Sequence, residues 1–163
     1  MSLAYSIHST MFHDFISLLF PEICSGCNNI LSKGEQLICS RCRYYLPLTR
    51  YHLETDHELI RKFWGKIPLK YALSYLKFTT GGRVQKMLHN LKYKGKKEIG
   101  FVLGQWYGIS LKNHDFQNQF DCIIPVPLHK KKLAKRGYNQ SDYFADGLSD
   151  SLQIPVQKEW LTR

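Results

Sequence analysis

The chain has 163 residues, of which 44% are hydrophobic and 13% aromatic. This composition can build a packed core, which excludes an intrinsically disordered chain, and the length suits one domain or a small module plus part of a larger one. The formal net charge of +10 suits a polyanionic partner, either a nucleic acid or a phosphorylated small molecule. Because net charge alone specifies no partner, a soluble basic surface is the alternative.

An apolar run near the N-terminus extends from Met11 to Phe20 and includes His13 and Asp14. A membrane span needs about 20 apolar residues, so we expect no integral membrane span. The apolar side chains of the run follow helical spacing, which predicts a short amphipathic helix ending at Pro21. No secretory signal is recognisable in the sequence.

Four of the five cysteines form two Cys-x-x-Cys pairs, namely Cys24, Cys27, Cys39 and Cys42. Without a secretory signal, this usage is typical of a reducing compartment, where metal thiolates are expected in place of disulfides. Each two-residue spacer aims both sulfurs at one ion, and four thiolates complete the tetrahedral shell of Zn²⁺. We therefore predict a structural zinc site. An iron–sulfur cluster, a redox-active dithiol and a chain that has lost its metal are the alternatives.

The pattern along the chain predicts three zones. Residues 1–50 hold the amphipathic helix and a zinc-ribbon-like four-cysteine module, whereas residues 51–68 are polar and form a linker with some helix. Residues 69–163 alternate between strand-like and helix-like patterns, which predicts an α/β domain with a doubly wound parallel sheet. The expected strands cover 71–78 and 121–126, and the expected helices cover 83–93, 99–111 and 141–152.

A basic segment follows the second expected strand and is predicted to form a loop over 127–137. Ligands of open α/β sheets bind at the carboxyl ends of strands, where helix N-termini offer N–H groups. Arg136 can bind two phosphate oxygens, Gly137 permits close backbone approach, and Asn139 can cap the next helix. The candidate phosphate-binding residues are Arg136, Gly137, Tyr138, Asn139, Gln140 and, from an earlier helix end, Lys92. The other lysines of the loop are expected to surround this site with positive charge. A solvated basic loop, with Lys92 complementing a helix dipole, is the alternative.

The order of these motifs resembles the ComF family of competence-associated proteins. The two cysteine pairs are followed by Leu-Lys-Tyr-Lys-Gly at 91–95, Ile-Pro-Val-Pro-Leu at 124–128 and Lys-Arg-Gly-Tyr-Asn-Gln at 135–140. The resemblance covers about residues 12–163. It implies a cytoplasmic protein with part of a type I phosphoribosyltransferase-like domain and a role in DNA uptake during natural transformation. A helicase-like competence protein and incoming single-stranded DNA are the implied macromolecular partners.

The resemblance also implies a small-molecule ligand, phosphoribosyl pyrophosphate or another nucleotide-like phosphate, bound with Mg²⁺ in an intact protein. The related enzymes carry a strand that ends in two acidic residues and a Thr-Thr-Gly turn. In this chain Thr79-Thr80-Gly81 follows Lys77-Phe78 and precedes the basic helix, so it is not the counterpart of that turn. We therefore assign no catalytic residue. We expect a fragment or a divergent short form with an incomplete ligand site and an exposed sheet edge.

A non-catalytic module is the second hypothesis from the sequence. The zinc module and the basic loops would form a platform for single-stranded DNA, on which Tyr44, Tyr93 and Tyr138 are available to stack with bases. In a related version of this hypothesis, the zinc-stabilised module is an adaptor for the helicase-like protein.

Overall fold

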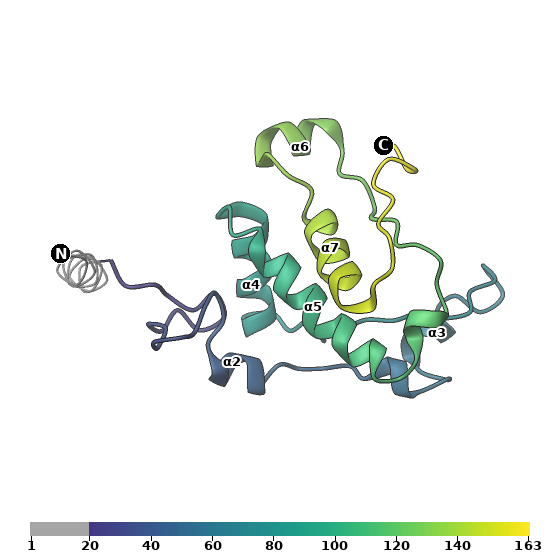
Figure 1. The fold of residues 1–163 in the computed structure, drawn as a ribbon, viewed down its shortest axis with the longest axis horizontal. Helices are drawn as coiled ribbons and strands as arrows, with labels where there is room; N and C mark the ends of the chain where they lie inside the picture. The colour runs from purple at the N-terminus through teal and green to yellow at the C-terminus, as the bar shows by residue number, and fades with distance from the viewer. Residues whose placement is uncertain (1–19) are drawn as a thin grey trace, which may run out of the picture. The chain divides into compact units, whose positions relative to one another are not determined.

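The structure, a computed structural model, describes residues 20–163. The helix predicted for the run that begins at Met11 lies outside these residues. The chain divides into two compact units, one that ends at Tyr45 and one that spans Leu46–Arg163. Each unit is described by itself, and Figure 1 shows the course of the chain through both of them.

The first unit is built from two turns, each of which presents one cysteine pair. In the first turn the Cys24 N–H donates to the Asn29 carbonyl at 2.8 Å, and the Asn28 N–H donates to the Cys24 carbonyl at 2.9 Å. In the second turn Cys39 is the N-cap of the short helix α2 (Ser40–Tyr44). Backbone hydrogen bonds therefore fix the local path of the chain around both pairs.

The second unit is largely helical. Its elements are η1 (Tyr51–Leu53), α3 (Glu58–Arg61), α4 (Arg83–Tyr93), α5 (Glu98–Lys112), η2 (Phe116–Asn118), α6 (Lys130–Arg136) and α7 (Gln140–Leu152). Helices α4, α5 and α7 confirm the helices predicted over 83–93, 99–111 and 141–152. No helix within residues 20–163 is long and apolar enough to cross a membrane.

Helices α5 and α7 pack against each other along their length, as Figure 1 shows. On α5, Gly100, Gly104 and Gly108 recur every four residues and therefore lie on one face, which meets α7. On α7, a Cβ atom added at Gly147 would lie 2.0 Å from the carbonyl oxygen of Phe101. The two backbones can approach this closely because these four residues have no side chain.

One hydrophobic core cluster of the second unit is formed by Tyr107, Leu111, Phe116, Leu152 and Ile154. Two tyrosines of segment 71–78 pack onto this core. The ring of Tyr75 stacks on that of Tyr107 with 4.8 Å between centroids, and the ring of Tyr71 lies 5.1 Å from that of Phe116. The first expected strand is therefore anchored by aromatic packing, which adds to the stabilisation from apolar burial.

The predicted doubly wound parallel sheet is not formed by residues 20–163. The extended pairings in this part of the chain are the single-residue bridges Ile23↔Ile30 and Leu48↔Leu76, both antiparallel, and Ile123↔Val156, which is parallel. A sheet requires neighbouring strands that pair over several residues. Parts of these segments, 75–78 and 123–126, instead line an apolar hollow of about 510 Å³. The sheet prediction is thus corrected for the described residues, because each segment has a paired neighbour on one edge only.

The segment predicted as a basic loop contains helix α6, so the loop prediction was wrong. At the start of the helix, His129 Nδ1 accepts a hydrogen bond from the Lys131 N–H at 3.3 Å. At its end, Gly137 has φ 81° and donates its N–H to the Leu133 carbonyl at 2.7 Å. The intervening lysines, leucine, alanine and arginine are good helix formers, and a cap at each end is enough to order them.

Replacing Gly147 with alanine is expected to lower the free energy of unfolding by about 3 kcal/mol. The added methyl group would collide with the carbonyl of Phe101, and no rotamer change can relieve a contact with backbone. The higher helix propensity of alanine would offset only about 1 kcal/mol of this loss of stability. Chemical denaturation measures the difference. Ser149→Ala in the same helix is the control and should change stability by less than about 0.5 kcal/mol. A Gly147→Ala protein as stable as the wild type would show that the close approach is not required.

Candidate metal centre and basic pocket

The four cysteines of the first unit form one cluster. The sulfurs of Cys24, Cys27, Cys39 and Cys42 all lie within 4.8 Å of one another. The Sγ atoms of Cys27 and Cys39 are 3.8 Å apart. A tetrahedral ion with metal–sulfur bonds of about 2.3 Å requires sulfurs about 3.8 Å apart. The cluster can therefore hold a metal ion such as zinc with little rearrangement.

Backbone N–H groups point at these sulfurs. The Sγ atom of Cys24 accepts hydrogen bonds from the N–H groups of Gly26 at 3.4 Å and Cys39 at 3.2 Å. Burial raises the pKa of the Cys24 thiol, but backbone hydrogen bonds, the largest from Cys39, outweigh burial and lower the pKa to about 6. The site thus favours a thiolate at Cys24, the protonation state that binds metal.

The other buried thiols of the cluster show why a cation is needed. Burial raises the pKa of Cys42, and the neighbouring cysteines raise it further. Burial also raises the pKa of Cys39, although a hydrogen bond from the Cys42 backbone N–H partly opposes this. Four sulfurs this close cannot all ionise unless a positive ion compensates them. A divalent metal would supply that charge, and four sulfur ligands would leave it no open position for a substrate. The cluster is therefore suited to a structural role.

Glu35 connects the segment between the two cysteine pairs to helix α2. Its carboxylate accepts the N–H of Ser40 at 2.7 Å and the N–H of Ser32 at 2.9 Å. These two hydrogen bonds, the larger from Ser40, hold the pKa of the Glu35 carboxyl below its usual value. Because Ser40 follows Cys39 directly, the carboxylate also helps to position the second cysteine pair.

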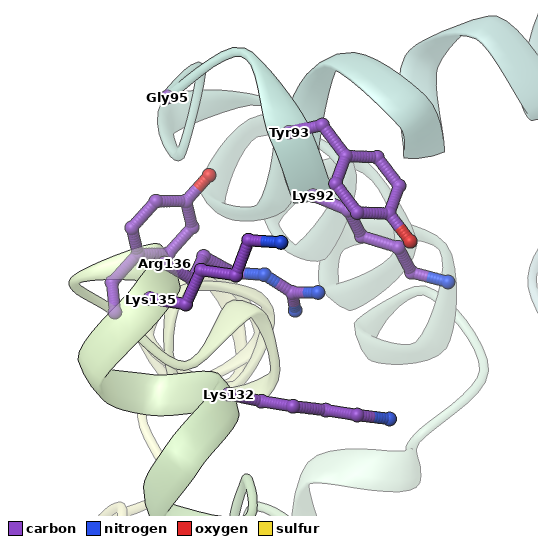
Figure 2. Close-up of a pocket in the computed structure, with 7 residues that line it drawn as sticks. Lys92, Tyr93, Gly95, Lys132, Lys135 and Arg136 are labelled. Carbon is purple, nitrogen blue, oxygen red and sulfur yellow. The ribbon is translucent and has the colours of Figure 1, made fainter.

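A pocket of about 320 Å³ in the second unit is lined mainly by cationic residues. We call it the basic pocket, and its lining residues are Lys92, Tyr93, Gly95, Lys132, Lys135, Arg136 and Tyr138. Four of these seven residues are cationic and none is acidic. The pocket lies between the end of α4 and helix α6, as Figure 2 shows.

Helical geometry explains why α6 presents three cations to the basic pocket. Lys132, Lys135 and Arg136 are spaced by three and four residues, so they share one face of the helix. In Figure 2 their side chains extend from α6 toward Lys92 and Tyr93 of α4. Positive charges gathered in one concave site raise the local potential, which an anion would neutralise.

Two contacts orient Arg136 within the basic pocket. Its Nη1 donates a hydrogen bond to Oε1 of Gln140. Its guanidinium carbon lies 5.7 Å from the centroid of the Tyr93 ring. Its other N–H groups have no partner within residues 20–163. A planar guanidinium held in this way can donate to two phosphate oxygens at once.

Tyr138 and Asn139, two of the predicted ligand residues, form hydrogen bonds with backbone groups of the protein. The Tyr138 hydroxyl donates to the Leu91 carbonyl of α4, which joins the loop after α6 to that helix. Asn139, only 8% exposed, accepts the Ser141 N–H at 3.3 Å and donates to the Val126 carbonyl at 3.1 Å. The predicted helix cap at Asn139 is thereby confirmed. Asn139 acts as a positioning residue, because its polar atoms are already used.

The structure brings Lys92, Arg136 and Tyr138 of the predicted set together in the basic pocket. Gly137 ends α6, and Gln140 begins α7 and holds Arg136. Two lysines expected only as surrounding charge, at positions 132 and 135, line the pocket itself, and so does Gly95. The three- and four-residue spacing of the cations could have predicted this arrangement. However, such spacing places side chains on one face only if the segment is helical.

No family model and no solved structure matches this chain. DNA utilization protein YhgH of Shigella flexneri is 26% identical over 144 residues, which cover 86% of this chain. The YhgH protein of Escherichia coli K12 is 25% identical over the same length. Competence protein F of Haemophilus influenzae is 25% identical over 141 residues, or 81% of this chain. These relatives support assignment of the chain to the ComF family. The chain spans about 60% of the length of these curated relatives.

Replacing Cys42 with serine is expected to remove most of the metal that the purified chain carries. A hydroxyl is a much poorer ligand than a thiolate, and Cys42 is a buried member of the cluster. Elemental analysis of freshly purified protein should give about one metal ion per chain for the wild type. Cys122→Ser is the matched control, because Cys122 is a free cysteine of the second unit. A wild-type chain without metal, or equal metal in all three proteins, would contradict a metal centre at this cluster.

Proposed function

We propose that this chain acts in DNA uptake as a ComF-family protein, with structural zinc in the cysteine cluster and a phosphate-bearing ligand in the basic pocket. Phosphoribosyl pyrophosphate or a related nucleotide is the proposed ligand. The names of the relatives, a DNA utilization protein and a competence protein, suggest the role in DNA uptake. The orientation of Arg136 among three lysines is the observation that carries the ligand proposal.

The size and charge of the basic pocket support a small polyanion. Its volume of about 320 Å³ is at the lower end of the range for small-molecule sites, about 300–1,000 Å³. Four cations would compensate the several negative charges of a pyrophosphate group. Since no carboxylate lines the pocket, a Mg²⁺ ion would arrive bound to the ligand's own phosphate oxygens. In a transfer reaction, the residues of this pocket would stabilise the departing pyrophosphate.

Replacing Arg136 with alanine is expected to weaken pyrophosphate binding by about 10- to 100-fold, because charge-assisted hydrogen bonds contribute about 1.5–3 kcal/mol. Isothermal titration calorimetry with pyrophosphate, and separately with phosphoribosyl pyrophosphate, measures the affinity at low salt. Lys130→Ala is the matched control, since Lys130 is a cation of the same helix that does not line the pocket. Absence of binding to the wild type at millimolar ligand, or equal losses in both variants, would refute the proposed site.

Single-stranded DNA is the second candidate ligand, and the exposure of two tyrosines favours it. Tyr93 is 68% exposed at the rim of the basic pocket, and Tyr44 is 81% exposed in the first unit. Exposed aromatic rings beside cations are typical of surfaces that bind single strands, where each stacked base contributes about 1–3 kcal/mol. For this role, the resemblance implies a helicase-like competence protein as a partner.

Salt dependence distinguishes the two ligands. If four cations contact DNA phosphates, the logarithm of the affinity for oligothymidine should fall against the logarithm of salt concentration with a slope of about −3. Tyr93→Ala should lower the affinity without changing the slope, whereas Arg136→Ala should make the slope shallower by about 0.7. Fluorescence anisotropy with labelled oligothymidine measures both. If DNA does not bind even at low salt, the single-strand proposal fails and the pyrophosphate proposal is unaffected.

A further inference from the structure

The basic pocket contains three primary amines besides the guanidinium of Arg136. Two of them belong to Lys132 and Lys135 of α6, and the third belongs to Lys92 of α4. Within residues 20–163, none of these amines forms an ion pair or a side-chain hydrogen bond. A lysine amine without a carboxylate partner can act as a nucleophile when it is neutral. The pocket therefore offers nucleophiles as well as positive charge.

Lys132 is the amine best placed beside the guanidinium. It precedes Arg136 by four residues, and residues with this spacing are neighbours on one face of a helix, with about 5–6 Å between their Cβ atoms. Lys135 is adjacent to Arg136 in the sequence, so its side chain leaves the helix in a direction rotated by about 100°. Lys92 comes from α4, on the other side of the pocket. In Figure 2 the Lys132 side chain extends from α6 into the pocket. An anion held by Arg136 would thus lie within reach of the Lys132 amine.

The contacts of Arg136 determine which part of a ligand would meet this amine. Gln140 and the Tyr93 ring orient the guanidinium and leave its other N–H groups available to phosphate oxygens. The group attached to a phosphate bound there would occupy the rest of the pocket, beside Lys132. In an acyl phosphate, that group begins with a carbonyl carbon, which an amine can attack. Binding would therefore bring an electrophile and a nucleophile together, which raises their effective concentration.

We propose that the basic pocket binds acyl phosphates, of which acetyl phosphate is the simplest, and that Lys132 is acylated there. The neutral amine of Lys132 attacks the carbonyl carbon, and a carbon–nitrogen bond forms. The bond between that carbon and the bridging oxygen breaks with its electron pair on the oxygen. Inorganic phosphate leaves with the proton that the nitrogen loses. Arg136 donates hydrogen bonds to the phosphate oxygens on which charge develops.

Acylation of Lys132 would regulate the basic pocket. The amide product carries no positive charge. One of the four cations that line the pocket is thereby lost. This inference rests on the anion site of the proposed function and adds to it a covalent modification that weakens the same site.

Peptide mass spectrometry on the whole chain, incubated with acetyl phosphate, measures the rate of acetylation at each lysine. Lys132 should be acetylated at least about tenfold faster than Lys130, which belongs to the same helix but does not line the pocket. The control reagent is N-hydroxysuccinimidyl acetate, which transfers the same acetyl group without a phosphate. Because both lysines are exposed, this reagent should acetylate them at comparable rates.

Two further measurements test whether the phosphate group directs the reaction. Arg136→Ala should lower the rate at Lys132 to that at Lys130. Lys131→Ala is the matched control, because it removes a cation of α6 that does not line the pocket, and it should leave the preference for Lys132 unchanged. In the wild type, saturating pyrophosphate should also abolish the preference, and this competition requires no altered protein.

Equal rates at Lys132 and Lys130 with acetyl phosphate would overturn the inference. A preference for Lys132 that the control reagent reproduces would do the same, because the amine would then be reactive without an anchored phosphate. So would faster acetylation of Lys92 or Lys135 than of Lys132, because the acceptor would be a different lysine.

Calorimetry with pyrophosphate on the same preparation separates this inference from the proposed function. If pyrophosphate binds but acetyl phosphate shows no preference for Lys132, the inference fails and the proposed ligand site stands. If pyrophosphate does not bind and Lys132 is still preferred in a manner that depends on Arg136, the proposed ligand is wrong and the inference stands.

Discussion

The close packing of α5 on α7 is the constraint on which the rest of the second unit depends. Glycines at the contact let the two backbones meet, and this fixes where α7 begins. Asn139 caps that end and also holds the Val126 carbonyl, so the buried segment, the turn and the helix are joined at one residue. Gln140 follows it and orients Arg136. A contact between helix backbones thus sets the position of the guanidinium in the basic pocket.

The two units are stabilised by different means. The second unit has a core of buried aliphatic and aromatic side chains contributed by several helices. The first unit is short, and its largest fully buried residues include Cys24 and Cys42. A module of this size cannot bury enough apolar surface to offset its conformational entropy, and a metal ion held by the cysteine cluster would supply the difference. This explains why backbone donors converge on sulfur atoms in the first unit, whereas side chains converge on one another in the second.

The sequence was most informative where a single local rule determines the structure. Apolar residues at helical spacing predicted α4, α5 and α7, and the spacing of Cys24, Cys27, Cys39 and Cys42 predicted their cluster. Helix α6 was missed because a run of lysines carries no apolar stripe, and its order depends on caps at His129 and Gly137. The expected sheet was not found because apolar extended patterns indicate burial but do not specify a pairing partner. Whether an extended segment finds a pairing partner depends on the other segments of the protein that lie beside it.

The apolar hollow and the basic pocket are linked by one stretch of backbone. Segment 123–126 lines the hollow, and the chain then passes through α6 to Asn139, whose side chain binds back to Val126. The hydrogen bond from Asn139 to Val126 therefore joins the two ends of the stretch that contains α6. An anion bound in the basic pocket would restrain the same stretch through contacts to Arg136. Anion binding is therefore expected to reduce the conformational freedom of segment 123–126 as well as that of α6.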